Sequence, residues 1–97
     1  MHATIESLRE IRPRITELAL QFGVSNVRVF GSVARGTAKE GSDVDLLVRM
    51  DEKRSLLDLI GFEQALEDEL STRVDVVIED GIHPMLQPAI LGEAIVL

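Results

Sequence analysis

The 97-residue sequence contains no cysteine, tryptophan or tyrosine, and only three phenylalanines. Without cysteine the chain can form neither a disulfide framework nor a cysteine-ligated zinc site. With so few aromatic residues the core must be aliphatic, and the stacking side chains that single-strand and RNA binders favour are missing. Hydrophobic residues still make up 45% of the chain, which excludes general disorder and predicts one small globular domain over residues 1–97.

Positive charge and long apolar runs are also scarce. Ten lysines and arginines stand against 17 acidic residues, which gives a formal net charge of −7. Nucleic-acid-binding proteins normally carry a basic surface, so we expect no direct nucleic-acid binding. No apolar run approaches the roughly 18 residues that a membrane span needs, and no secretory signal is visible. We therefore expect a cytoplasmic protein that makes no membrane contact.

Hydrophobic periodicity predicts short helices alternating with short strands. Apolar residues three and four positions apart indicate an amphipathic helix over residues 5–22, which Pro13 either kinks or divides in two. Apolar and β-branched runs predict strands at Val27–Phe30, Asp43–Met50 and Arg73–Glu79. Three further segments complete the pattern: a helix over residues 56–70 capped by Ser55, a helix from Pro84 to about Gly92, and an extended piece over residues 94–97.

The connection between the first two strands predicts their relative direction. Residues 31–42 contain three glycines and have room for one helical turn at Ser32–Arg35, but not for a full crossover helix. A connection of this kind favours antiparallel pairing over a right-handed parallel crossover. We therefore predict an α+β fold with a small mixed, largely antiparallel sheet and with helices mainly on one face.

Three aspartates lie within the predicted strands. Asp43 and Asp45 are two residues apart, so in a strand they project from one face at a spacing of about 6.6 Å. Asp75 stands in an otherwise apolar strand, where a carboxylate is costly unless it is exposed, paired or bound to metal. If this strand neighbours the previous one, the three carboxylates could hold two Mg²⁺ ions for in-line displacement at phosphorus. The alternatives are a solvated strand edge for Asp43 and Asp45, and an exposed position near Arg73 for Asp75.

The segment GSVARG, residues 31–36, directly follows the first predicted strand. Gly31 lets the backbone approach a ligand closely, and Ser32 offers a hydroxyl and an N–H at a helical turn of the kind that binds phosphate. Arg35 could add a charge-assisted contact to a triphosphate. The alternatives are an ordinary strand-to-helix turn and a solvated arginine. A Walker A loop is a poor match, because Thr37 stands where its lysine should be.

Together, the Gly-Ser pair, the SDVDL segment and the later Asp75 resemble the nucleotidyltransferase superfamily of DNA polymerase β, over nearly the whole chain. The length resembles the minimal branch of that superfamily, the MNT proteins. The resemblance implies a palm-like nucleotidyltransferase fold, ATP as substrate and two Mg²⁺ ions as cofactors. It further implies that Gly31 and Ser32 bind the triphosphate and that Asp43 and Asp45 are metal ligands. Asp75 would hold the catalytic metal and accept the proton of the attacking hydroxyl.

The resemblance also implies a protein partner. Proteins that look like this are often paired with a HEPN-domain toxin, and the MNT protein is then the antitoxin that adenylylates a tyrosine of its partner. Two other functions remain open: a non-catalytic antitoxin that acts by occlusion, and a nucleotidyltransferase that acts on a small molecule. Large apolar residues in the C-terminal segment would suit a partner, although we expect most of them to close the domain's own core: Met85, Leu86, Ile90, Leu91, Ile95, Val96 and Leu97.

Overall fold

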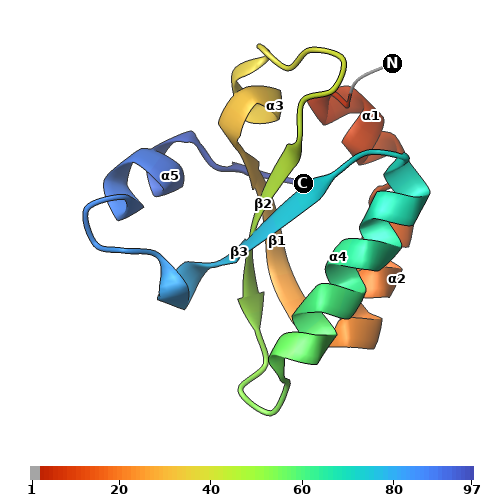
Figure 1. Ribbon diagram of the computed structural model, residues 1–97, viewed down its shortest axis with the longest axis vertical. Coiled ribbons are helices and arrows are strands. Elements are labelled where there is room, and N and C mark those ends of the chain that lie inside the picture. The colour runs from red at the N-terminus through yellow and green to blue at the C-terminus, as the bar shows by residue number, and fades with distance from the viewer. Residues whose placement is uncertain (1–2) are drawn as a thin grey trace.

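The computed structural model describes residues 3–97 as a four-stranded sheet with the order β3-β2-β1-β4 (Figure 1). β1 pairs antiparallel with both β2 and β4, whereas β2 and β3 are parallel. The mixed, largely antiparallel sheet is therefore confirmed. In chain order the elements are α1 (Ile5–Glu10), α2 (Arg12–Phe22), β1 (Val24–Phe30), α3 (Gly31–Arg35), β2 (Val44–Met50), α4 (Leu56–Leu70), β3 (Val74–Ile78), the 3-10 helix η1 (Glu79–Gly81), α5 (Gln87–Glu93) and β4 (Ile95–Val96).

One face of the sheet packs against α2 and α4, while α5 lies on the far side (Figure 1). Leu46 of β2 and Phe62 of α4 are fully buried in this helix-covered core. Gly61 of α4 makes room for the ring of Phe22 on α2, because a Cβ at Gly61 would meet that ring. Burial of each large side chain stabilises the fold by about 1.5–3 kcal/mol. This face therefore supplies much of the stability of the domain.

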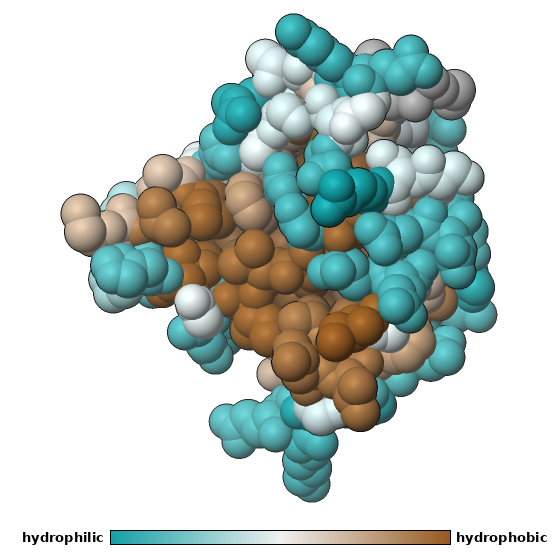
Figure 2. All heavy atoms as spheres, in the orientation of Figure 1, coloured by the Kyte–Doolittle hydropathy of each residue, from teal (hydrophilic) through white to brown (hydrophobic). Residues whose placement is uncertain are grey.

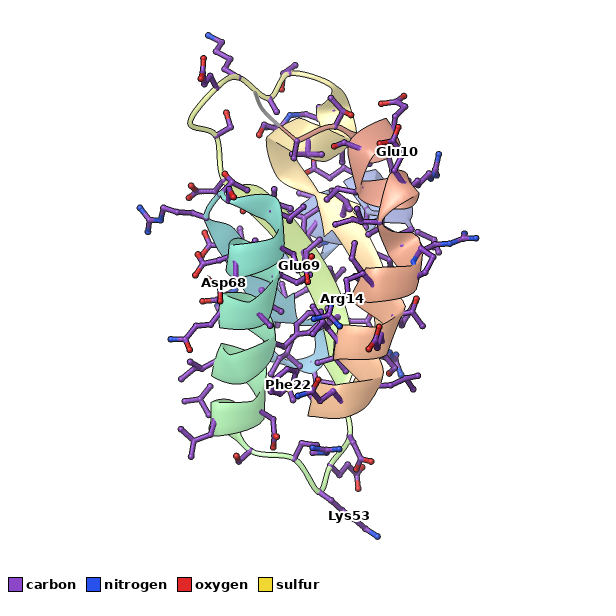
Figure 3. All side chains as sticks on the ribbon, turned by 90° about the vertical axis from the view of Figure 1, so that its right-hand side faces the viewer. Glu10, Arg14, Phe22, Lys53, Asp68 and Glu69 are labelled. Carbon is purple, nitrogen blue, oxygen red and sulfur yellow. The ribbon has the colours of Figure 1, made fainter. Side chains whose placement is uncertain are left out.

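The helical layer is also joined across its surface by an ion pair. Arg14 of α2 donates from Nε to a carboxylate oxygen of Glu69 on α4, at 2.6 Å, and the two side chains meet between the helices (Figure 3). Both side chains are partly exposed, so the pair contributes little to the free energy of unfolding. Within residues 3–97, no helix combines the length and apolarity that a bilayer crossing requires.

Pro13 divides the first predicted helix in two. α1 ends at Glu10, and Ile11 serves as the cap between it and α2, which begins at Arg12. Proline is tolerated there because the first turn of a helix leaves its N–H groups without intrahelical partners. The predicted cap of α4 is confirmed: Ser55 and Asp58 form a reciprocal capping box.

Two predicted boundaries are each wrong by three residues, a larger difference than at the other elements. β1 begins at Val24 rather than Val27, because a register shift between Ser25 and Arg28 and a positive φ of 52° at Asn26 let the strand continue through turn-like residues. The last helix begins at Gln87 rather than Pro84. The residues after Pro84 form a turn instead, and Pro88 is the proline in the first turn of α5.

The expectation that the C-terminal apolar residues mostly close the core is also wrong. Met85 is 83% exposed, and Leu86, Leu91 and Val96 are exposed as well. Of the seven residues, only Leu97 is buried, at 8% exposure. The reason is that α5 is short and packs mainly beside α3, away from the helix-covered core. Figure 2 shows the resulting apolar surface, which extends from α5 across the sheet edge to the start of α4.

Candidate active site

The face of the sheet opposite α2 and α4 carries the predicted carboxylates. Strand register places Asp45 of β2 directly beside Asp75 of β3, and Phe30 of β1 on the other side of Asp45. Neighbouring strands lie about 4.8 Å apart, so the two aspartates are adjacent on one face. Asp43 stands two residues earlier, immediately before β2 begins. The structure thus gathers the three predicted aspartates at the N-terminal ends of two parallel strands.

The negative charges of these aspartates are not balanced. Burial raises the pKa of Asp45, and the nearby carboxylates of Asp75 and Asp43 raise it further, while Arg35 lowers it. Asp45 and Asp43 are half-buried and Asp75 is exposed. An ionised Asp45 is therefore held in an unfavourable environment, which a bound cation would relieve.

The donor set suits a magnesium ion in kind, since it consists of carboxylate oxygens and contains no sulfur or imidazole ligand. As the side chains stand, no three acidic or histidine groups within residues 3–97 form a closed set of metal ligands. These three aspartates therefore match a magnesium site in the chemistry of their oxygen ligands and in the strand register that pairs Asp45 with Asp75.

The Gly31 turn lies against the same carboxylates. Gly31 has a φ of 73°, and a Cβ at this position would overlap the Asp45 carboxylate, so only glycine fits. α3 begins here, with half-buried Ser32 in its only full turn and Arg35 at its end. The helical turn thus starts one residue earlier than predicted. The structure brings the predicted phosphate-binding turn into contact with the predicted metal ligands.

One further charged residue reaches this turn from the far end of the chain. The Gly31 N–H donates to Glu93 Oε1 at 2.7 Å, and Arg35 Nη1 donates to both oxygens of Glu93, at 3.2 and 3.0 Å. These bonds, that from Gly31 first, lower the pKa of Glu93, which is therefore ionised at neutral pH. The sequence does not predict Glu93 as a site residue, because it lies 62 positions from Gly31 and no local spacing reveals the contact.

Asp75 is open to solvent, while Asp43 and Asp45 are half-buried. A hollow of about 370 Å³ beside α3 is lined by Arg35, Gly36 and the start of α1, but by none of the three aspartates. An open site of this kind can admit a bulky acceptor, such as a side chain that belongs to another protein. A deep pocket, by contrast, buries most of the surface of a small molecule.

Comparisons with known proteins agree with this geometry. The family described as Nucleotidyltransferase domain matches residues 8–97. Protein adenylyltransferase MntA of Thermococcus cleftensis is 42% identical over 93 residues, which cover 92% of this chain and 94% of that protein. A Methanocaldococcus jannaschii protein that is provisionally named a protein adenylyltransferase is 43% identical over 89 residues, covering 92% of this chain and 96% of that protein.

Solved structures give the same result. One provisionally described as a minimal nucleotidyltransferase superposes with a TM-score of 0.86 at 49% identity, covering 99% of this chain and 98% of the other. The crystal structure of a toxin–antitoxin with AMP-PNP matches with a TM-score of 0.73 and covers 87% of this chain and 69% of the other, but at 21% identity it shows a shared fold alone. The chain therefore belongs to the Nucleotidyltransferase domain family, and it is a nucleotidyltransferase of the minimal type.

Proposed function

We propose that this protein transfers AMP from ATP to a hydroxyl group of a partner protein, and that Asp43, Asp45 and Asp75 carry the reaction. The observation that supports this most strongly is the strand register, which sets Asp45 beside Asp75 while the same carboxylate touches the Gly31 turn. A triphosphate bound at the turn would then have its α-phosphorus close to the carboxylates. The names of the two archaeal relatives, both protein adenylyltransferases, favour this reaction over others of the family.

In this proposal the Gly31 turn and the aspartates have different roles in the reaction. The Ser32 hydroxyl and N–H, with the Arg35 guanidinium, hold the triphosphate and stabilise the charge that develops on the leaving pyrophosphate. Asp75 accepts the proton of the acceptor hydroxyl. The acceptor oxygen forms a bond to the α-phosphorus as the bond to the pyrophosphate oxygen breaks, so AMP is transferred and pyrophosphate is released.

We propose that Asp43, Asp45 and Asp75 hold up to two Mg²⁺ ions when ATP is bound. Bound Mg²⁺ would neutralise the triphosphate and stabilise the attacking and leaving oxygens of an in-line displacement. The carboxylates of the chain have a second task, which is to fix the position of this charge relative to the Gly31 turn. The raised pKa of Asp45 supports this role, since the cost of its ionisation falls once a cation is near.

We further propose that the acceptor is a tyrosine of a HEPN-type toxin and that the chain is its antitoxin. The exposed apolar surface that extends from α5 to α4 offers a place for that partner (Figure 2), and exposed Leu91 of α5 and Ile60 of α4 belong to these two helices. β3 is also the strand that carries Asp75. A partner bound there would lie next to the carboxylates. Its basic surface, if it cleaves RNA, would suit the −7 charge of this chain.

Label transfer tests the proposal. The protein is incubated with Mg²⁺, α-labelled ATP and the product of the neighbouring gene, and label is followed on the partner. We expect transfer by the wild type, and by Asp68→Asn, which removes an exposed acid of α4, the helix on the other face of the sheet (Figure 3). Transfer should be lost in the variant carrying Asp43→Asn and Asp45→Asn. Undiminished transfer by that variant would contradict the proposed roles of the two aspartates.

The same double variant separates catalysis from occlusion. The apolar surface does not depend on the aspartates, so an antitoxin that acts by occlusion would still protect cells from the partner after both substitutions. A catalytic antitoxin would lose that protection. Protection is measured as growth of cells that express the partner together with each variant, and full protection by the double variant would establish occlusion instead.

A further inference from the structure

Hydrogen bonds within the Gly31 turn hold its C-terminal end, where the N–H groups of Gly36 and Thr37 donate to the carbonyls of Val33 and Ser32, but they do not engage the Gly31 N–H. Phe30, which precedes α3, makes no side-chain hydrogen bond to the N-terminus of that helix. Gly31 itself cannot carry a side chain, because the Asp45 carboxylate occupies the space beside it. Glycine adopts positive and negative φ about equally readily, so the residue type alone does not fix the positive φ of Gly31. The Gly31 N–H donates instead to a group from a distant part of the chain.

That group is Glu93, the last residue of α5. Its carboxylate accepts from the Gly31 N–H at 2.7 Å and from Arg35 Nη1 at 3.0 Å. One half-buried carboxylate thus binds both ends of the five-residue helix α3. Hydrogen bonds to a charged acceptor are roughly twice as strong as neutral ones, which suits a clamp that has few other contacts.

The hydrogen bonds of Glu93 to Gly31 and Arg35 leave other donors of the turn available for a ligand. The bonds to Glu93 use only Nη1 of Arg35, and within residues 3–97 no hydrogen bond engages its Nε or Nη2. The Ser32 N–H and hydroxyl likewise do not bond to Glu93. A guanidinium has five donors in a rigid fork, so Arg35 can contact Glu93 on one side and a phosphate on the other.

We propose that Glu93 is a positioning residue for the nucleotide site: it fixes the Gly31 turn and directs Arg35 toward the triphosphate. The inference rests on the proposed function, because it takes the Gly31 turn as the triphosphate site. It also connects the site to α5, which carries the exposed apolar side chain of Leu91. Alternatively, the Glu93 carboxylate could compete with phosphate for Gly31 and Arg35. In that case removal of the carboxylate would strengthen nucleotide binding, whereas a positioning role predicts weaker binding.

The test compares the affinity of a non-hydrolysable ATP analogue with Mg²⁺ for the wild type, Glu93→Gln and Glu93→Ala. Residues that support metal ligands typically contribute about 10- to 100-fold in affinity or activity, and we expect Glu93→Ala to weaken analogue binding by a factor of the same order. Glu93→Gln keeps an acceptor for the Gly31 N–H, so its affinity for the analogue should lie between those of the wild type and Glu93→Ala. Glu69→Ala is the matched control, since it also removes an arginine partner, at 2.6 Å, but from the helix-covered side.

A double-mutant cycle distinguishes positioning through Arg35 from general loosening of the fold. If Glu93 acts by directing Arg35, the effects of Glu93→Ala and Arg35→Ala on analogue affinity will be strongly non-additive. The amide proton of Gly31 should also shift upfield in Glu93→Ala, without nucleotide. Failure of the wild type to bind the analogue would overturn the proposed function and this inference together. Binding by the wild type, with unchanged or tighter binding by Glu93→Ala, would overturn this inference alone.

Discussion

The helix-covered face and the opposite face of the sheet are built from alternate residues of the same strands. Along β2, Leu46 and Val48 point into the fully buried core, while Asp45 and Arg49 point the other way. Burial of the first set stabilises the fold. Burial and the neighbouring carboxylates raise the pKa of Asp45, so its ionised form costs free energy. A packed face thus holds repelling carboxylates in register on the reverse side of the same backbone.

The largest expected effect belongs to the packed face. Phe62 is fully buried between α4 and the sheet, so Phe62→Ala should lower the free energy of unfolding by about 3–5 kcal/mol. Urea unfolding followed by circular dichroism measures this change. A loss below about 1 kcal/mol would mean that the helix-covered face does not supply the stability assigned to it.

The next effect separates activity from stability on the opposite face. Asp75→Asn should reduce the rate of AMP transfer about 10²- to 10³-fold, because charge stabilisation and the proton acceptor are both lost. Asp75 is exposed, so the melting temperature should stay close to that of the wild type. Initial rates of label transfer measure the expected loss of activity, and thermal melting measures the expected absence of a change in stability. A variant that melts early would place Asp75 among the structural residues instead.

A third prediction concerns a stabilising ion pair on the face that carries the site. Glu79 accepts from the nearly buried Arg28 at 2.6 Å and from Arg49 at 2.8 Å, and these bonds, that from Arg28 first, lower the pKa of Glu79. Stability from a lowered carboxylate pKa is present at neutral pH and is lost as pH falls through the folded-state value. Glu79→Gln should therefore reduce the melting temperature by about 5 °C at pH 7 and by less in acid. An equal reduction at both pH values would contradict the charge-based account.

The smallest effect has the opposite sign. The folded-state pKa of Asp45 is raised, so the ionised group costs stability at neutral pH, and that cost disappears as pH falls below the unfolded-state value of about 4. In the presence of a chelator, Asp45→Asn should raise the melting temperature by about 2–4 °C at pH 7, with no gain near pH 3. Thermal melts at the two pH values measure this. A variant that melts below the wild type at pH 7 would contradict the idea that Asp45 is kept at a cost.

Local patterns in the sequence were sufficient for much of this fold. The β-branched runs predicted three of the strands, and Ser55 predicted the start of α4, because both signals act over a few residues. The start of β1 was missed, since Ser25 and Asn26 look like a turn and only pairing with β2 extends the strand through them. The start of α5 was misplaced because Pro84 and Pro88 satisfy the same helix-start rule.

In the candidate site, too, local features could be predicted from the sequence and tertiary contacts could not. The spacing of Asp43 and Asp45 predicted their common face, but their proximity to Asp75 depended on which strands are neighbours. The contact of Glu93 with Gly31 could not be predicted from a single sequence, because it depends on the path of the chain from β3 back to α3. Interactions fixed by tertiary packing leave no periodic signal.

The central claim is that the carboxylate-bearing face binds a nucleotide while the helix-covered face carries the stability. Thermal melting with and without Mg²⁺ and a non-hydrolysable ATP analogue tests it most directly, because a ligand at 100 times its Kd stabilises the folded state by about 2.7 kcal/mol. The account predicts a rise of about 10 °C or more for the wild type and for Asp68→Asn, and none for the variant with Asp43→Asn and Asp45→Asn. An equal rise in that double variant, or no rise in the wild type, would contradict it.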